Sequence, residues 1–227
     1  MINCEMPEEI DCLEDIMNKN IKDNLINIAR EKLKENDPSH DIYHALRVLK
    51  NAEDIAAKEN GDLYIIVPSA LFHDTICYPK NHPKSKFSSI ESADLAVKIL
   101  EELNQYPKDK ISKVYTSIEQ CSFSKNAIPK LLEAKILQDA DRLDATGAIS
   151  IMRTFCSAGL MNSKLYNYED PFCKRREPDS LDYALDLFYT RLLKIKDVMH
   201  TQTAKILAER RTKILLEYLK SLEEELS

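Results

Sequence analysis

The sequence predicts a single all-α domain. Only three of its 227 residues are glycine, and leucine, isoleucine, alanine, lysine and glutamate are abundant, which favours helices. Apolar side chains recur at spacings of three and four, and neither an internal repeat nor a low-complexity linker divides the chain. One helical domain over residues 1–227 is the simplest interpretation, and a chain of this length can bury a substantial core.

The first third of the chain should form three helices. Residues 8–35 carry an apolar stripe and are expected to form an N-terminal helix that packs on the rest. The turn at residues 37–39 offers caps to a second helix, which should end at residues 60–62. Residues 63–67 could form a short strand. Because proline suits the first turn of a helix, we instead expect a buried helix that begins near Pro68.

The rest of the chain continues the helical pattern. Between Gly159 and Asp179 lies a long irregular segment with the basic triplet Lys174-Arg175-Arg176. Such a segment could close over phosphates as a lid, although most are solvated connections. Helices are expected at about 89–105, 108–121, 130–141, 144–158, 180–198 and 201–225.

Composition and charge exclude several classes of function. The three glycines are too far apart to form a glycine-rich phosphate-binding loop. The net charge of −6 disfavours long nucleic acid as a partner. A small anionic substrate remains possible beside a bound cation. No apolar run approaches the length of a membrane span, no secretion signal is recognisable and the six cysteines form no C-x-x-C pair, so we expect a cytoplasmic protein with reduced thiols. The chain could form a homo-oligomer.

A His-Asp pair occurs twice, at His40-Asp41 and at His73-Asp74. The dipeptide alone is weak evidence for a site. The second pair, however, ends a nearly wholly apolar helix, where an imidazole and a carboxylate are costly unless something pairs with them. A divalent cation is a good candidate, because imidazole and carboxylate together suit Mn, Fe, Co, Ni or Zn.

Further ligands for such a cation should come from other helices. His44 lies beside the apolar stripe of its helix and can point inward, although a lone inward histidine is more often a satisfied core residue. Three aspartates, Asp139, Asp141 and Asp144, interrupt an otherwise core-like helix end. A capped helix terminus would also explain them. Proximity to a cation explains their density better.

These motifs resemble the HD superfamily of metal-dependent phosphohydrolases, whose pattern is a lone His, a His-Asp pair and a distant Asp on different helices. His44, His73-Asp74 and Asp141 match that pattern. Residues 138–148 resemble the signature of a bacterial-type subgroup similar to nucleotide pyrophosphohydrolases. The resemblance covers residues 39–211 and implies a helical HD-domain bundle with one divalent metal ion held by these four residues. It also implies that His40-Asp41 caps a helix or supports the ligands.

By the same resemblance, the activity is hydrolysis of a phosphoanhydride or phosphoester in a small nucleotide-like substrate. Conversion of a (deoxy)nucleoside triphosphate to monophosphate and pyrophosphate is the nearest analogy. A di-iron HD-type oxygenase and a non-catalytic nucleotide-binding module are the alternatives. One metal is favoured over two, because two-metal relatives recruit extra histidines and this chain has none between His82 and His200. Cys121 stands where many subgroup members are expected to have a histidine.

The metal could be Mn, Mg, Co, Ni, Fe or Zn, with manganese a leading candidate. Either Asp74 or Asp144 is expected to orient or deprotonate the attacking water, although Asp144 could equally cap its helix or pair with Arg142. Three cations are predicted to contact the substrate phosphates: Lys80, Arg47 and Arg153.

Overall fold

The computed structural model describes residues 17–34, 40–78, 82–121 and 128–227. Within these ranges no strand is present, and the one β-type pairing is an isolated bridge between Lys164 and Tyr183. This confirms the predicted all-α class. None of the helices in the described ranges is long and apolar enough to span a membrane. The α-helices are α1 (Lys19–Lys32), α2 (Ile42–Glu59), α3 (Leu63–Phe72), α4 (Ser88–Glu102), α5 (Ile111–Glu119), α6 (Leu132–Asp144), α7 (Gly147–Leu160), α8 (Asp186–Thr190) and α9 (Gln202–Leu226).

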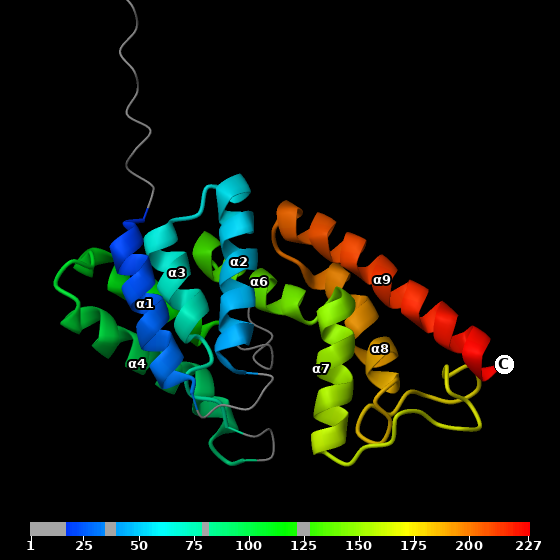
Figure 1. Ribbon diagram of the computed structural model, residues 1–227. Coiled ribbons are helices and arrows are strands. Elements are labelled where there is room, and N and C mark those ends of the chain that lie inside the picture. The colour runs from blue at the N-terminus through cyan, green and yellow to red at the C-terminus, as the bar shows by residue number, and fades with distance from the viewer. Residues whose placement is uncertain (1–16, 35–39, 79–81, 122–127) are drawn as a thin grey trace, which may run out of the picture.

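The helices form two adjoining groups (Figure 1). In the larger group, α1, α2, α4, α5 and α6 surround α3, whose residues from Ile65 to Phe72 are all buried. The smaller group contains α7, α8, a 3₁₀ helix (Leu192–Val198) and α9. Its own apolar cluster includes Phe188 and Leu215, and Met199 packs against both clusters. The two groups meet where α6 leads into α7 and where α9 contacts α2 and α6.

Helix α2 follows its sequence pattern closely. The carboxylate of Asp41 accepts the backbone N–H of His44 at 2.9 Å and so caps the first turn. Asn60 ends the helix in the left-handed conformation with φ 58°. The first His-Asp pair thus contributes a helix cap, as expected. This cap fixes the start of α2 one turn before His44.

Helix α3 begins at Leu63, so the predicted start near Pro68 is wrong. The side chain of Asp62 accepts the N–H of Tyr64 at 2.9 Å, and this cap starts the helix earlier than the proline suggested. Pro68 lies inside the helix and cannot donate to the carbonyl oxygen of Tyr64, four residues back. The buried hydroxyl of Tyr106 donates to that carbonyl instead. The interior proline is therefore tolerated.

Other predicted boundaries also need correction. Helix α1 begins at Lys19, where Asn18 caps it, and the predicted residues 8–16 and 35 lie outside the described ranges. Helix α6 runs without a break to Asp144, so the expected boundary near residue 141 is wrong. The expected continuous helix 180–198 is wrong. The backbone of residues 182–185 bonds residues 164–165, and helical structure begins only at α8 (Asp186–Thr190) and continues as the 3₁₀ helix (Leu192–Val198).

Asp139 ties α6 to the start of α9. Its side chain is fully buried and accepts the backbone N–H groups of His200 and Thr201, at 2.9 and 2.7 Å. The hydroxyl of Thr201, which caps α9, donates to the same carboxylate at 2.8 Å. One buried carboxylate therefore satisfies three donors at the point where the two helix groups meet.

Asp139→Ala should therefore destabilise the fold, because it leaves these donors buried and unpaired. We expect the free energy of unfolding, measured by urea denaturation, to fall by roughly 2–4 kcal/mol. Asp197 is exposed and serves as a matched control; Asp197→Ala should change it by less than about 0.5 kcal/mol. Equal effects of the two changes would contradict the assigned role.

Candidate metal centre

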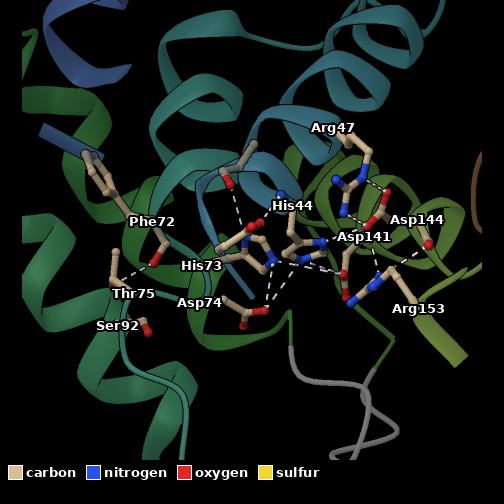
Figure 2. A network of polar contacts seen from close by, with 12 residues as sticks. His44, Arg47, Phe72, His73, Asp74, Thr75, Ser92, Asp141, Asp144 and Arg153 are labelled. Atoms are coloured by element: carbon tan, nitrogen blue, oxygen red, sulfur yellow. Dashed lines mark hydrogen bonds and ion pairs between the residues drawn. The ribbon is translucent and has the colours of Figure 1, made fainter. Parts of the chain in front are cut away.

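Four predicted ligands converge where α2, α3 and α6 meet (Figure 2). His44 projects from α2, His73 and Asp74 follow the end of α3, and Asp141 projects from α6. Potential ligand atoms of His44, His73 and Asp141 all lie within 4.8 Å of one another. Asp74 is not a member of this group of three, although its carboxylate lies near both histidines.

The imidazole Nε2 atoms face the two carboxylates. The distances from Nε2 of His44 to an oxygen of Asp74 and to one of Asp141 are both 3.6 Å. The corresponding distances from Nε2 of His73 are 3.4 and 3.9 Å. These separations exceed ordinary hydrogen bonds, so the imidazoles and the carboxylates face one another without bonding directly.

Hydrogen bonds at Nδ1 orient both histidines. Nδ1 of His73 donates to the carbonyl oxygen of Ala70 at 2.9 Å. Nδ1 of His44 lies 2.8 Å from the carboxylate of Asp144 and donates to it. In neutral imidazole a proton on Nδ1 leaves the lone pair on Nε2, which is the atom aimed at the cluster. The bonds at Nδ1 thus leave Nε2 of each ring as the atom available to a metal.

The two Nε2 atoms are buried and make no hydrogen bond. A buried polar nitrogen without a partner is costly, and two of them facing two carboxylates fit a divalent cation well. The histidine side chains are 1–2% exposed, whereas those of Asp74 and Asp141 are 31 and 32% exposed. The cluster is therefore closed behind the imidazoles and open to solvent beside the carboxylates, where a substrate can approach.

The pKa values of His44 and Asp74 are both shifted in the direction that favours positive charge at the cluster. Burial alone would lower the pKa of His44, but its bond to Asp144 and the nearby carboxylates of Asp74 and Asp141 raise it to about 9. Burial opposes ionisation of Asp74, yet His73 and His44 hold its pKa well below the usual range. A cation would take the place of the proton on His44.

Asp144 lies behind His44, on the Nδ1 side of its ring (Figure 2). Its side chain is 3% exposed, and two arginines bind it: Arg47 at 2.7 and 3.0 Å, and Arg153 at 2.9 Å. Burial raises its pKa, but His44 and Arg47 more than offset this and keep it ionised. This position favours a role in holding His44 over the predicted role in deprotonating water. The pairing considered for Asp144 with Arg142 is replaced by these contacts; Arg142 bonds the carbonyl oxygen of Val198 at 2.7 Å.

The three aspartates of α6 point in different directions, because successive helix residues are rotated by roughly 100°. Asp141 and Asp144 are separated by about 60° around the axis and lie on either side of His44. Asp139 faces the start of α9 instead. The expectation that all three gather near a cation is therefore wrong for Asp139.

The predicted substrate contacts have different outcomes. Lys80 lies outside the described residues. Arg47 and Arg153 both bind Asp144, and contact of either with substrate stays a prediction. No sequence pattern pointed to Arg191, which lies in an irregular break before the 3₁₀ helix. Burial lowers the pKa of this guanidinium, and the charge of nearby Asp141 partly offsets that effect.

The sequence also drew attention to three residues that are not predicted ligands: His40, Cys121 and His82. His40 lies with its ring centroid 6.1 Å from that of His44. Cys121 is buried, and burial followed by the charges of Asp141 and Asp74 raises the pKa of its thiol. His82 is exposed and stacks on Tyr78 with 4.9 Å between ring centroids. Neither Cys121 nor His82 belongs to the cluster of possible ligands found among the described residues.

The basic triplet of the 159–179 segment binds acidic partners in the smaller helix group. Arg176 donates to the buried carboxylate of Asp186 at 2.7 Å, and Lys174 pairs with Glu223. Asp170 accepts the backbone N–H groups of Lys174 and Arg175. Closure of this segment over the site stays a prediction.

The raised pKa of His44 predicts a pH dependence for the stability of metal-free protein. Its folded-state pKa of about 9 exceeds the model value of 6.5, so its contribution is fully present below pH 6.5 and is lost as pH rises through 9. With a chelator present, we expect urea denaturation to give a loss on the order of 3 kcal/mol across that window. His44→Gln should abolish the slope and His82→Gln should keep it. An unchanged slope in His44→Gln would refute the assignment.

Comparison with known proteins places the chain in a family. The sequence model of the HD domain matches residues 41–146, which contain all four predicted ligands. YpgQ of Bacillus subtilis is 31% identical over 206 residues, covering 86% of this chain and 88% of YpgQ.

Solved structures extend the likeness to the smaller helix group. The crystal structure of YpgQ in complex with ADP has a TM-score of 0.70 and 32% identity, covering 91% of this chain and 95% of that one. An HD-superfamily hydrolase from Bacillus thuringiensis has a TM-score of 0.70 and 30% identity, with 91 and 96% coverage. The Lin1889 protein of Listeria innocua has a TM-score of 0.66 and 34% identity, with 92 and 98% coverage. The chain therefore belongs to the HD-domain family and has the fold of its HD-superfamily hydrolases.

Proposed function

We propose that this protein is a metal-dependent phosphohydrolase that cleaves a phosphoanhydride or phosphoester bond in a nucleotide-like substrate. The observation that carries the proposal is the pair of buried, unbonded Nε2 atoms of His44 and His73, which face two partly exposed carboxylates. The two imidazoles are buried and held in place, whereas the two carboxylates are accessible to solvent. That arrangement suits a catalytic metal centre, which needs room for water and substrate.

One divalent cation is proposed, with His44, His73, Asp74 and Asp141 as its ligands. When bound, such an ion lowers the pKa of a water molecule and neutralises charge on a phosphoryl oxygen. Two imidazoles and two carboxylates accommodate Mn, Fe, Co, Ni or Zn, and Mg is also considered. A single cluster of possible ligands among the described residues supports one metal over a di-iron set.

Side chains of the protein would orient the attacking water and attract the negatively charged substrate. Asp74 is ionised and partly exposed, so it can accept a hydrogen bond from the attacking water and orient it. Its lowered pKa makes it a weak base, which favours orientation over full deprotonation. The charge of Asp141 acts on the guanidinium of Arg191, and we propose that this cation attracts a substrate phosphate.

A nucleotide is proposed as the substrate class on two grounds. The relative YpgQ, which is 32% identical in the aligned region, has been crystallised with ADP. Residues 138–148 also resemble the signature of nucleotide pyrophosphohydrolases. Release of pyrophosphate from a (deoxy)nucleoside triphosphate is therefore the specific reaction that we propose, and this step rests on analogy within the family.

A nucleotide screen tests the proposal. Protein loaded separately with Mn, Mg, Co or Ni should convert at least one (deoxy)nucleoside triphosphate to its monophosphate and pyrophosphate, as resolved by anion-exchange chromatography. Asp141→Ala removes one proposed ligand and should abolish both stoichiometric metal binding and turnover. Release of neither phosphate nor pyrophosphate from the panel by metal-loaded protein would reject the activity, and turnover surviving in Asp141→Ala would reject the ligand set.

Asp144→Asn tests the support behind His44. The amide carries no charge, and its NH₂ group can donate to Nδ1 and so shift the imidazole proton to Nε2. We expect metal affinity, measured by isothermal titration calorimetry, to fall about 10- to 100-fold. The exposed Asp197→Asn carries the same charge change and should leave the affinity unaltered. Equal affinities for the two variants would contradict the role of Asp144.

A further inference from the structure

A second cleft lies on the other side of Asp144 from the four predicted ligands. Its volume is about 530 Å³, and residues of α2, the α6–α7 junction and α9 line it. Asp144 and Arg47 belong to its wall, but none of the four predicted ligands does. The cleft is therefore separate from the substrate approach beside Asp74 and Asp141.

Three cationic side chains line this cleft: Arg47, Lys50 and Arg211. Arg211 is held in place by bonds of 2.8 Å to the carbonyl oxygen of Leu143 and to the side chain of Asn51. The single carboxylate in the lining is Asp144, and Arg153 as well as Arg47 already neutralises it. Three cations and one carboxylate give the lining a net charge of +2, which Asp54 reduces to +1 where it pairs with Lys50 at the exposed rim. This balance favours an anionic occupant.

The start of α7 adds backbone donors to the cleft. Gly147 has φ +67°, and a Cβ there would lie 3.2 Å from Cβ of Arg211, so glycine lets the arginine stem cross closely over the helix start. Thr146 does not cap the helix; its hydroxyl donates to the carbonyl oxygen of Leu143. The first N–H groups of this 14-residue helix thus lack a side-chain cap beside the cationic side chains.

Apolar surface accompanies the positive charge. Tyr43, Leu46 and Ile214 also line the cleft, and the tyrosine and isoleucine are 63 and 40% exposed. Clefts of about 300–1,000 Å³ with apolar walls and a few polar groups are typical of small-molecule sites. An aromatic base can pack on Tyr43 and Ile214, while phosphates reach Arg211 and the start of α7. Inorganic phosphate alone would leave the apolar wall uncovered.

We propose that the cleft between α2, α7 and α9 is a second binding site for a nucleoside di- or triphosphate. The occupant would share Arg47 with Asp144, and through Asp144 it would adjoin the support of His44. The proposal extends beyond hydrolysis at the metal centre. It requires neither a bound metal nor turnover, so it can be tested independently of the proposed activity.

The test uses ADP and full-length protein in the presence of a chelator, so that metal-dependent binding is absent. Ile214→Glu places a carboxylate on the cleft wall, while Leu216→Glu places the same charge on an exposed position of α9 outside the lining. Calorimetry should give at least a tenfold weaker Kd for Ile214→Glu and a change of less than twofold for Leu216→Glu. Hydrogen exchange should slow on ADP addition at residues 147–151 and 209–215 in wild type, but not in Ile214→Glu.

A second pair of variants checks the electrostatic part. Lys50→Glu reverses a charge at the cleft rim, and Lys58→Glu makes the same change two turns along α2, outside the lining. Only the former should weaken ADP binding. Failure of metal-free protein to bind ADP at millimolar concentration would overturn the proposal. So would equal ADP affinities for Ile214→Glu and wild type, or ADP protection confined to the residues around His73 and Asp141.

Discussion

The site depends on the hydrogen bond between Nδ1 of His44 and the buried carboxylate of Asp144. Arg47 and Arg153 neutralise that carboxylate, so it can stay ionised in a position with 3% exposure. The bond fixes which nitrogen of His44 faces the cluster and holds its ring against α6. The carboxylate of Asp144 also joins the two helix groups, because it binds Arg153 of α7 as well as His44 and Arg47 of α2. Structural support and metal-binding chemistry thus use the same carboxylate.

Helix α3 has a complementary role, because its burial decides where the His-Asp pair lies. Every residue from Ile65 to Phe72 is buried, so the helix is anchored by apolar contacts on all sides. It ends where His73 bonds the carbonyl oxygen of Ala70, and the chain then emerges at Asp74 beside solvent. The buried helix thereby places His73 and Asp74 at the boundary between the core and the solvent-exposed side of the site.

The three aspartates of helix α6 have three different roles. Rotation around the helix sends Asp139 toward α9, Asp141 toward the imidazoles and Asp144 behind His44. The same rotation separates two possible ligand sites: one in front of the imidazoles, and the cationic cleft behind Asp144. An HD-domain chain can in this way place a metal centre and a second anion-binding surface on opposite sides of one buried carboxylate.

The sequence by itself determined the all-α class and most helix positions, because apolar periodicity and caps are properties of neighbouring residues. The four residues that converge were singled out by the resemblance of the sequence motifs to the HD superfamily. The Asp41 cap and the end of α2 at Asn60 follow from such local rules. The start of α3 was misjudged because the carbonyl that Pro68 leaves free is satisfied by Tyr106, 42 residues beyond Tyr64. Likewise, His44 and Asp144 are 100 residues apart, and only tertiary packing decided that they bond and that Asp139 bonds the start of α9. Local patterns fix which face of a helix is apolar, but the partner of a buried polar group is chosen by whichever distant element packs against that face.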